Sequence, residues 1–147
     1  MKILLAIDGS VPALDAVRHA LRLVTEGLRA SFVLVNVQEP ASLYEMVVAH
    51  DAEVLERMRS AAGADLLAPA EALLDAAGLD YESEVAGGEP ANLLIELAEN
   101  YGCDALIMGA SGMGETDDSL GSVALALLHN SPVPVTLVRR QPPESEQ

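Results

Sequence analysis

Aromatic residues and cysteine are scarce in this sequence of 147 residues, which has no Trp, one Phe, three Tyr and one Cys. Half of the residues are apolar, so the interior must be built from Ala, Val, Leu and Ile. Such an interior suits helices packed on a sheet. Cys103 cannot close a disulfide within the chain, and no secreted disulfide framework is present. We therefore expect a protein of the reducing cytoplasm.

Basic residues and long apolar runs are also few. Eight Lys and Arg stand against 23 Asp and Glu, which gives a formal net charge of -15. Such a surface repels phosphate backbones and anionic lipid, so nucleic acid is excluded as an expected partner. No apolar run approaches the roughly 18 residues of a membrane span, and no signal-peptide pattern precedes Lys2. We expect neither export nor a membrane-spanning segment.

Short apolar runs, often β-branched, alternate with longer segments of helical period, as in repeated βαβ units. Residues 3–7 and 105–108 do not alternate with polar residues, so both faces of those strands must be covered. The sequence predicts an α/β fold: one three-layer domain over residues 1–140, with helices on both faces of a five-stranded parallel sheet, and a disordered acidic tail over 141–147. The expected strands are Lys2–Ile7, Ser31–Val37, Asp80–Val85, Ala105–Gly109 and Pro134–Val138.

Capping residues and periodicity place the helices. Ser10 as N-cap and Pro12 in the first turn predict a helix whose sheet-facing residues are Leu14, Val17, Leu21 and Val24. A second helix is expected over 51–77. Pro69 lies inside it and would remove a backbone hydrogen bond at a cost of about 3 kcal/mol, so we expect a kink or a break.

Two further helices follow glycine-containing turns. Gly87 and Gly88 introduce the first, which runs to about Asn100 and ends at Gly102. The second begins near Leu120 and ends before Pro132. Residues 39–50 have no firm period and are expected to form an irregular loop.

Two polar and glycine-rich segments follow strands. Residues 8–10 (Asp-Gly-Ser) follow the first strand, and residues 109–112 (Gly-Ala-Ser-Gly) follow the fourth and continue to 121–123 (Gly-Ser-Val). Ligands of open parallel sheets bind outside the carboxyl ends of strands, where the winding direction reverses. Glycines permit close approach, and a helix start offers free N–H groups to an anion. A phosphate is therefore expected at Gly112, Gly121 and Ser122, although these glycines would equally serve a tight strand-to-helix turn.

Four landmarks in this order resemble the universal stress protein family: residues 2–10, 87–91, 109–122 and 132–138. The resemblance spans nearly the whole chain. It implies a sheet in the order 3-2-1-4-5, of the adenine nucleotide alpha hydrolase-like type. Many members bind ATP through a pattern of Gly, two residues, Gly, nine residues, and Gly followed by Ser or Thr.

The resemblance also implies a role for each site residue. Asp8 would contact the ribose or the adenine end of ATP, although it also suits the end of a buried strand. The backbone around Ala6 and Val37 would line the adenine pocket. The residues expected to bind the nucleotide at its phosphates, or to lie in the same glycine segment, are Gly109, Ser111, Gly112, Gly121, Ser122 and Val123.

The chain departs from the family pattern between Gly112 and Gly121. Eight residues lie there in place of nine, and they include Glu115, Asp117 and Asp118. A carboxylate about 8 Å from a phosphate charge costs about 2 kcal/mol at an effective dielectric of 20. A Mg²⁺ ion shared with the phosphates would reverse that effect. We expect weak or Mg²⁺-dependent ATP binding, with these three residues as candidate metal ligands or as a solvated acidic loop.

No catalytic machinery can be identified. Ser111 does not stand in a Gly-x-Ser-x-Gly elbow, and His19, His50 and His129 lack metal-ligand spacing. At most, slow hydrolysis of a bound ATP is expected. Two alternatives stay open: a nucleotide-free stress protein that acts as an interaction dimer, and a small adenylating enzyme. The turn at residues 8–12 is poor in glycine for the pyrophosphate loop of such an enzyme.

The fifth strand predicts a partner. Its residues Val135, Thr136, Leu137 and Val138 would end the sheet, and an open apolar edge invites pairing with another chain. Family members dimerise by antiparallel pairing of this strand, so the resemblance implies a homodimer with a self-complementary contact. A client protein is expected but is not identified by the sequence.

Overall fold

The computed structural model describes residues 1–39, 51–111 and 120–140. All the strands and helices expected from the sequence are present there, with ends that differ by a few residues. The tail 141–147, the segment 112–119 and all of the expected loop except Glu39 lie outside the described residues. The elements are β1 (Lys2–Ala6), α1 (Val11–Thr25), β2 (Ser31–Gln38), α3 (Ala52–Ala76), β3 (Tyr81–Gly87), α4 (Pro90–Asn100), β4 (Ala105–Gly109), α5 (Ser122–Asn130) and β5 (Val135–Val138).

The strands form one parallel sheet in the order β3-β2-β1-β4-β5. Central β1 pairs with β2 on one side and with β4 on the other, so that Leu4 lies between Val33 and Leu106. This arrangement confirms the expected order. The winding direction reverses at β1, and the carboxyl ends of β1 and β4 therefore meet where a ligand crevice is expected.

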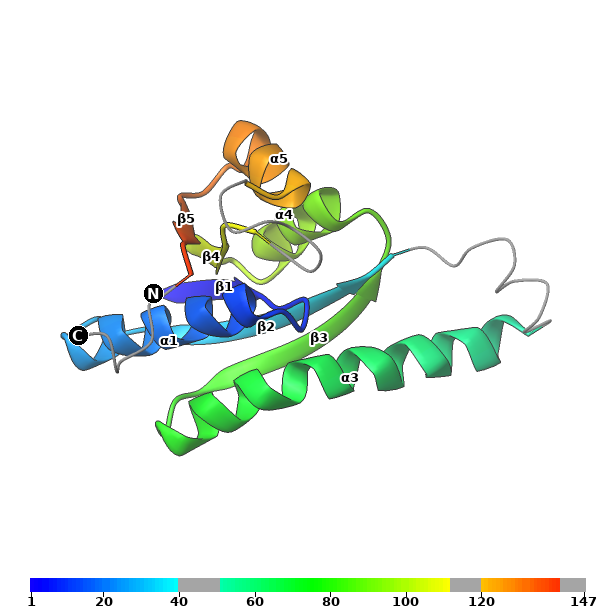
Figure 1. Cartoon of the computed structure of the whole chain (residues 1–147), viewed down its shortest axis with the longest axis horizontal. Helices are drawn as coiled ribbons and strands as arrows, with labels where there is room; N and C mark the ends of the chain where they lie inside the picture. The colour runs from blue at the N-terminus through cyan, green and yellow to red at the C-terminus, as the bar shows by residue number, and fades with distance from the viewer. Residues whose placement is uncertain (40–50, 112–119, 141–147) are drawn as a thin grey trace.

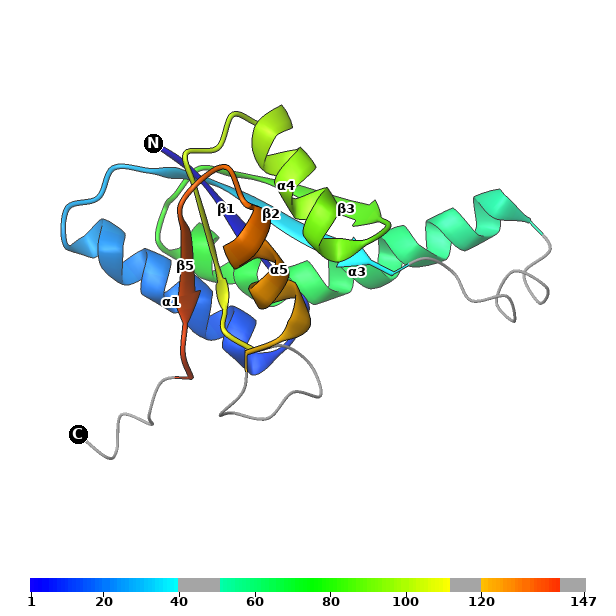
Figure 2. The same cartoon turned by 90° about the horizontal axis from the view of Figure 1, so that it is seen from above.

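Helices cover both faces of the sheet. Helices α1 and α3 lie on one face, and α4 and α5 lie on the other (Figures 1 and 2). Alternate strand residues serve the two layers: Phe32 and Leu34 belong to the cluster under α1 and α3, and Val33 and Val35 to the cluster under α4 and α5. The uninterrupted apolar runs therefore do pack on both faces, which confirms the three-layer sandwich.

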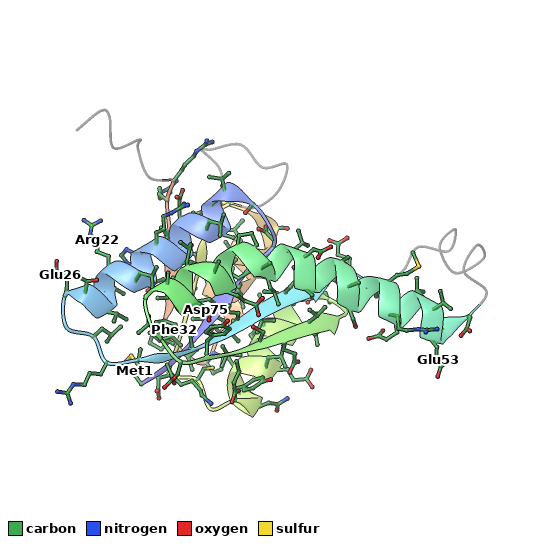
Figure 3. All side chains as sticks on the ribbon, turned by 90° about the horizontal axis from the view of Figure 1, so that it is seen from below. Met1, Arg22, Glu26, Phe32, Glu53 and Asp75 are labelled. Carbon is green, nitrogen blue, oxygen red and sulfur yellow. The ribbon has the colours of Figure 1, made fainter. Side chains whose placement is uncertain are left out.

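Helix α3 is continuous across Pro69, and Figure 3 shows it unbroken between Glu53 and Asp75. Of the two outcomes expected there, the break does not occur. Proline removes one N–H from the helical ladder. On either side of it the helix buries Leu67, Ala70 and Leu74 against the sheet, each at most 2% exposed. Burial of such side chains is worth about 1.5–3 kcal/mol for a leucine, which offsets the lost hydrogen bond.

Helix α3 packs closely over β2 and β3 because it has a glycine at the crossing. A Cβ atom on Gly63 would overlap the methyl groups of Val85 and would lie 3.0 Å from Oδ1 of Asn36. One turn earlier, the Arg59 guanidinium lies beside Gly87 at the end of β3. Helix α3 thus runs antiparallel to β3, and its first turns extend past the carboxyl edge of the sheet (Figure 1).

Tyr101, at the end of α4, contacts β3. Its O–H donates to Oε1 of Glu84 at 2.6 Å, and this hydrogen bond, with partial burial, raises the pKa of Tyr101 to about 12. An unfolded tyrosine has a pKa near 10. The stabilisation is therefore complete below pH 10 and is lost as the pH rises through 12.

We expect Tyr101→Phe to lower the free energy of unfolding by about 0.5–1.5 kcal/mol at pH 8, because the Glu84 hydrogen bond is lost. The difference from the unsubstituted protein should shrink between pH 10 and pH 12. Urea unfolding of both proteins at several pH values measures it. A difference that stays constant up to pH 12 would contradict this assignment.

Candidate functional site

A cavity of about 320 Å³ lies at the carboxyl edge of the sheet, where β1 and β4 end. This volume falls within the range of pockets that hold small ligands, about 300–1,000 Å³. Strands β1, β2 and β4 contribute to its lining together with the starts of α1, α4 and α5. The described lining residues are Ala6, Ile7, Asp8, Ser10, Ala13, Val35, Val37, Glu39, Pro90, Leu94, Met108, Gly109, Ala110, Ser111, Gly121, Ser122, Val123 and Ala124.

The cavity brings together the residues that the sequence singled out. The first and fourth strand-to-helix connections meet there, as expected, and their role in nucleotide binding stays a prediction. Gly112 and the candidate metal ligands Glu115, Asp117 and Asp118 lie outside the described residues. The predicted residues that line the cavity are Ala6, Asp8, Val37, Gly109, Ser111, Gly121, Ser122 and Val123.

The turn between β1 and α1 is fixed by side-chain caps. Oδ1 of Asp8 accepts a hydrogen bond from the Ser10 N–H at 2.9 Å, and Oγ of Ser10 accepts one from the Ala13 N–H at 3.2 Å. Gly9 adopts a φ of 87°, which L-residues rarely adopt, and a side chain there would also overlap Leu66. Asp8 is both the turn former and an exposed carboxylate at the cavity. The two interpretations offered for Asp8 are therefore compatible.

Gly109 has a packing role that the sequence did not reveal. A Cβ atom there would lie 2.8 Å from both the carbonyl carbon and the Cβ of Pro12, in the first turn of α1. Real Cβ atoms do not approach other atoms so closely, and the backbone of a helix cannot move aside easily. The absence of a side chain at residue 109 therefore lets α1 rest on the end of β4.

Helix α5 begins at the cavity, and no side chain among the described residues caps its N-terminus. Its N-cap is Gly121, which has no side chain to accept from the first N–H groups, and Ser122 and Val123 line the cavity. The other helices at the cavity are capped, α1 by Ser10 and α4 by Glu89, whose Oε2 accepts from the Asn92 N–H at 2.8 Å. Free N–H groups and the helix dipole make such a terminus favourable for an anion.

Part of the lining is apolar, with Val35 and Val37 from β2 and Met108 from β4, the two strands that flank β1. The charged side chains of the described lining are Asp8 and Glu39, and no Lys, Arg or His is found among the lining residues that the structure describes. The cavity thus combines apolar lining residues, the N-terminus of one helix and two carboxylates.

Some lining residues were not predicted, for different reasons. Val35 pairs with Ala6 in the register of β1 and β2, so a prediction of register would have identified it. Pro90 and Leu94 belong to α4, which follows β3 in sequence and reaches the cavity only by crossing the sheet. No local pattern indicates that path.

Other candidate chemistry receives no support within the described residues. No group of three or more His, Cys, Asp or Glu there is placed to hold a metal ion. Cys103 is buried in the cluster under α4 and α5, and burial raises the pKa of its thiol, which agrees with a packing role. None of the helices described is long and apolar enough to cross a membrane.

Comparison with known proteins agrees with the fold. The Universal stress protein family matches residues 1–139. Universal stress protein MJ0531 of Methanocaldococcus jannaschii is 27% identical over 140 residues, which are 95% of this chain and 82% of that protein.

Two solved structures of similar fold contain nucleotides. One is a universal stress protein in complex with cAMP, with a TM-score of 0.66, 24% identity, and coverage of 96% of this chain and 98% of that one. The other is an Arabidopsis thaliana universal stress protein family protein with AMP bound, with a TM-score of 0.70, 18% identity, and coverage of 99% and 94%. Because the family matches nearly the whole length of this chain, the chain belongs to the universal stress protein family.

Proposed function

We propose that this protein binds an adenine nucleotide in the cavity at the ends of β1 and β4. The observation that carries the proposal is that one cavity pairs apolar lining residues with the N-terminus of α5, where no described side chain forms a cap. An aromatic base and a phosphate need these two environments side by side. The cAMP and AMP complexes of two proteins of the same fold support the same ligand class.

The cavity residues suit one orientation of the ligand. The adenine ring would lie against Val35, Val37 and Met108, where apolar surface can be covered. The Asp8 carboxylate would accept a hydrogen bond from a ribose hydroxyl. A phosphate would accept hydrogen bonds from the backbone N–H groups of Ser122 and Val123 at the start of α5.

The charges of the lining predict which nucleotide binds best. Asp8 and Glu39 repel phosphate, and no described cationic side chain of the lining compensates. Each carboxylate–phosphate pair about 8 Å apart costs about 2 kcal/mol at an effective dielectric of 20. We expect AMP and cAMP to bind at least about tenfold more tightly than ATP without Mg²⁺, and Mg²⁺ to raise ATP affinity selectively.

Titration calorimetry with cAMP, AMP and ATP, each with and without Mg²⁺, tests the proposal, and GMP controls for recognition of the base. Absence of binding of any adenine nucleotide at millimolar concentration would overturn it. The protein would then be better described by the alternative, a nucleotide-free dimer that acts through protein contacts.

We further propose a homodimer through antiparallel pairing of β5. Strand β5 lies at one side of the sheet, with β4 as its neighbour. The N–H groups of Leu106 and Ala110 donate to the carbonyl oxygens of Pro134 and Val138, so the backbone groups of these two residues face β4. Backbone groups of successive strand residues face opposite sides, and the N–H groups of Val135 and Leu137 therefore point away from β4. The other edge, β3, carries Glu82 and Glu84. Acidic side chains on an edge oppose pairing, so β5 is the better docking edge.

The dimer is tested by sedimentation at micromolar concentration. Leu137→Pro removes an outward N–H while sparing the β4 ladder, and should yield a monomer that is still folded. Leu137→Ala, which loses a comparable part of the side chain but keeps the N–H, is the matched control and should remain dimeric. A monomeric unsubstituted protein would remove the proposal.

A further inference from the structure

Asn36 is a fully buried carboxamide at a position where the strand pattern calls for an apolar residue. It is 1% exposed, and it follows Phe32 and Leu34 on the face of β2 that α1 and α3 cover. Buried polar side chains are costly unless they are hydrogen-bonded. The partners of Asn36 therefore indicate what its amide group does in this fold.

Both ends of the Asn36 amide are bonded. Its Nδ2 donates to the carbonyl oxygen of Ile7 at 2.8 Å, and its Oδ1 accepts from Nε2 of Gln38 at 2.7 Å. The ladder between β1 and β2 ends at this point, with the Ile7 N–H donating to the Val35 carbonyl at 2.8 Å. The side chain of Asn36 thus adds one hydrogen bond to β1 beyond the last backbone pair.

That added bond acts on the peptide that leads into the cavity. The Ile7 carbonyl belongs to the peptide group between Ile7 and Asp8, so the bond restricts the direction in which Asp8 leaves the sheet. Ile7, Asp8 and Ser10 all line the cavity, whereas Asn36 does not. Asn36 therefore supports the cavity turn from the far side of the sheet.

Helix α3 restricts the amide in turn. The Cα of Gly63 lies so near that a Cβ atom there would be 3.0 Å from Oδ1 of Asn36. Any larger residue at 63 would press on the amide. The closely packed helix and the two hydrogen bonds together leave Asn36 one orientation, which a positioning role requires.

We infer that Asn36 is a positioning residue that sets the turn of residues 8–10, and with it the nucleotide site, through the Ile7 carbonyl. The part that concerns nucleotides rests on the function proposed above. The part that concerns the turn does not, because it is a property of the unliganded chain. The two parts have separate measurements.

The first measurement is hydrogen exchange of the unliganded protein by NMR. Asn36→Leu keeps the branched shape of the side chain at Cγ but removes the donor to Ile7. We expect the Ser10 and Ala13 amides, whose hydrogen bonds hold the turn, to exchange about tenfold faster or more. Leu74→Ala removes a buried side chain near the end of α3 and controls for lowered stability. We expect this variant not to accelerate exchange of Ser10 and Ala13 more than that of other amides.

The second measurement is AMP affinity by calorimetry, at a temperature where circular dichroism shows every variant folded. We expect Asn36→Leu to bind about tenfold more weakly or worse. Gln38→Met, which removes the partner of Oδ1 but keeps the donor to Ile7, should lose clearly less affinity than Asn36→Leu. Asn36→Ser, whose hydroxyl is too short to reach Ile7 and introduces no overlap, replaces Asn36→Leu if that variant does not fold.

Unchanged exchange of Ser10 and Ala13 in the Asn36 variants would overturn the inference, whether or not AMP binds. An equal loss of affinity in Leu74→Ala would also overturn it, because the effect would then follow general stability. If the unsubstituted protein binds no nucleotide but the exchange change is seen, the proposed function fails and the role of Asn36 in the turn stands.

Discussion

Gly109→Ala is expected to lower the free energy of unfolding by about 2–3 kcal/mol, because the new methyl group would overlap Pro12. The atoms it would meet are the carbonyl carbon, the carbonyl oxygen and the Cβ of Pro12, all between 2.8 and 2.9 Å away. Relief requires α1 to move off the end of β4. Urea unfolding measures the change, and thermal unfolding should show a loss of about 4–12 °C.

Gly102→Ala is the matched control for this prediction. Apart from its chain neighbours, no atom of the described residues lies within 4 Å of a Cβ at Gly102, but its φ of 67° disfavours alanine, so the cost of about 1–2 kcal/mol is conformational. Gly102→Asn should recover part of that cost, since Asn tolerates this backbone region, whereas Gly109→Asn should be worse than Gly109→Ala. Equal effects of Ala and Asn at Gly109 would contradict overlap as the cause.

Ser122→Glu is expected to weaken AMP binding about 30-fold or more while leaving the protein as stable as before or slightly more so. Ser122 is the exposed first residue of α5. A carboxylate there favours the helix dipole by about 0.3–1 kcal/mol. It opposes a phosphate at the same helix end by about 2 kcal/mol at an effective dielectric of 20.

The opposite signs of the two effects make this prediction specific to an anion site. Calorimetry gives the affinity and urea unfolding gives the stability of the same preparation. Ser122→Gln has the same size without the charge and should bind AMP within a few-fold of the unsubstituted protein. A loss of affinity that is as large for Gln as for Glu would point to steric exclusion and contradict a phosphate at this position.

The layered fold could be predicted from local patterns, because each pattern reflects a burial requirement. The apolar run at residues 3–7 lacks polar alternation since β1 is central and covered on both faces. The cap at Ser10 is a local hydrogen bond, visible from spacing alone. The strand order, in contrast, came from the family resemblance, because nothing local indicates which strands become neighbours.

Other features depend on contacts between distant segments. The continuity of α3 through Pro69 depends on burial of its neighbours against the sheet, which local propensity does not include. The cap of α4 could not be predicted from residue preference, because glutamate is not among the preferred N-cap residues. In the structure both carboxylate oxygens of Glu89 accept hydrogen bonds from backbone N–H groups. Asn36 shows no signal beyond a polar residue in an apolar strand.

The candidate site could be predicted where the order of strands in the sheet determines the positions of its residues. Asp8 follows β1 and Gly109 ends the adjacent parallel strand β4, so their meeting at one cavity is a consequence of the order of strands. The sequence explained the glycine at residue 109 only in part. It suggested close approach of a phosphate, and the structure adds close contact with Pro12. Overlap between α1 and β4 can be known only once both are placed.

Because all five strands run in the same direction, every turn lies either at the carboxyl ends or at the amino ends of the strands, and the cavity lies at the carboxyl ends. The amino ends of the strands carry Met1 and the turns at 26–30, 77–80, 101–104 and 131–134. A biosensor tethered through its amino terminus, or a fluorophore attached at Gly78, would thus leave the pocket mouth open to solution. The molecule offers separate sides for immobilisation and for ligand capture.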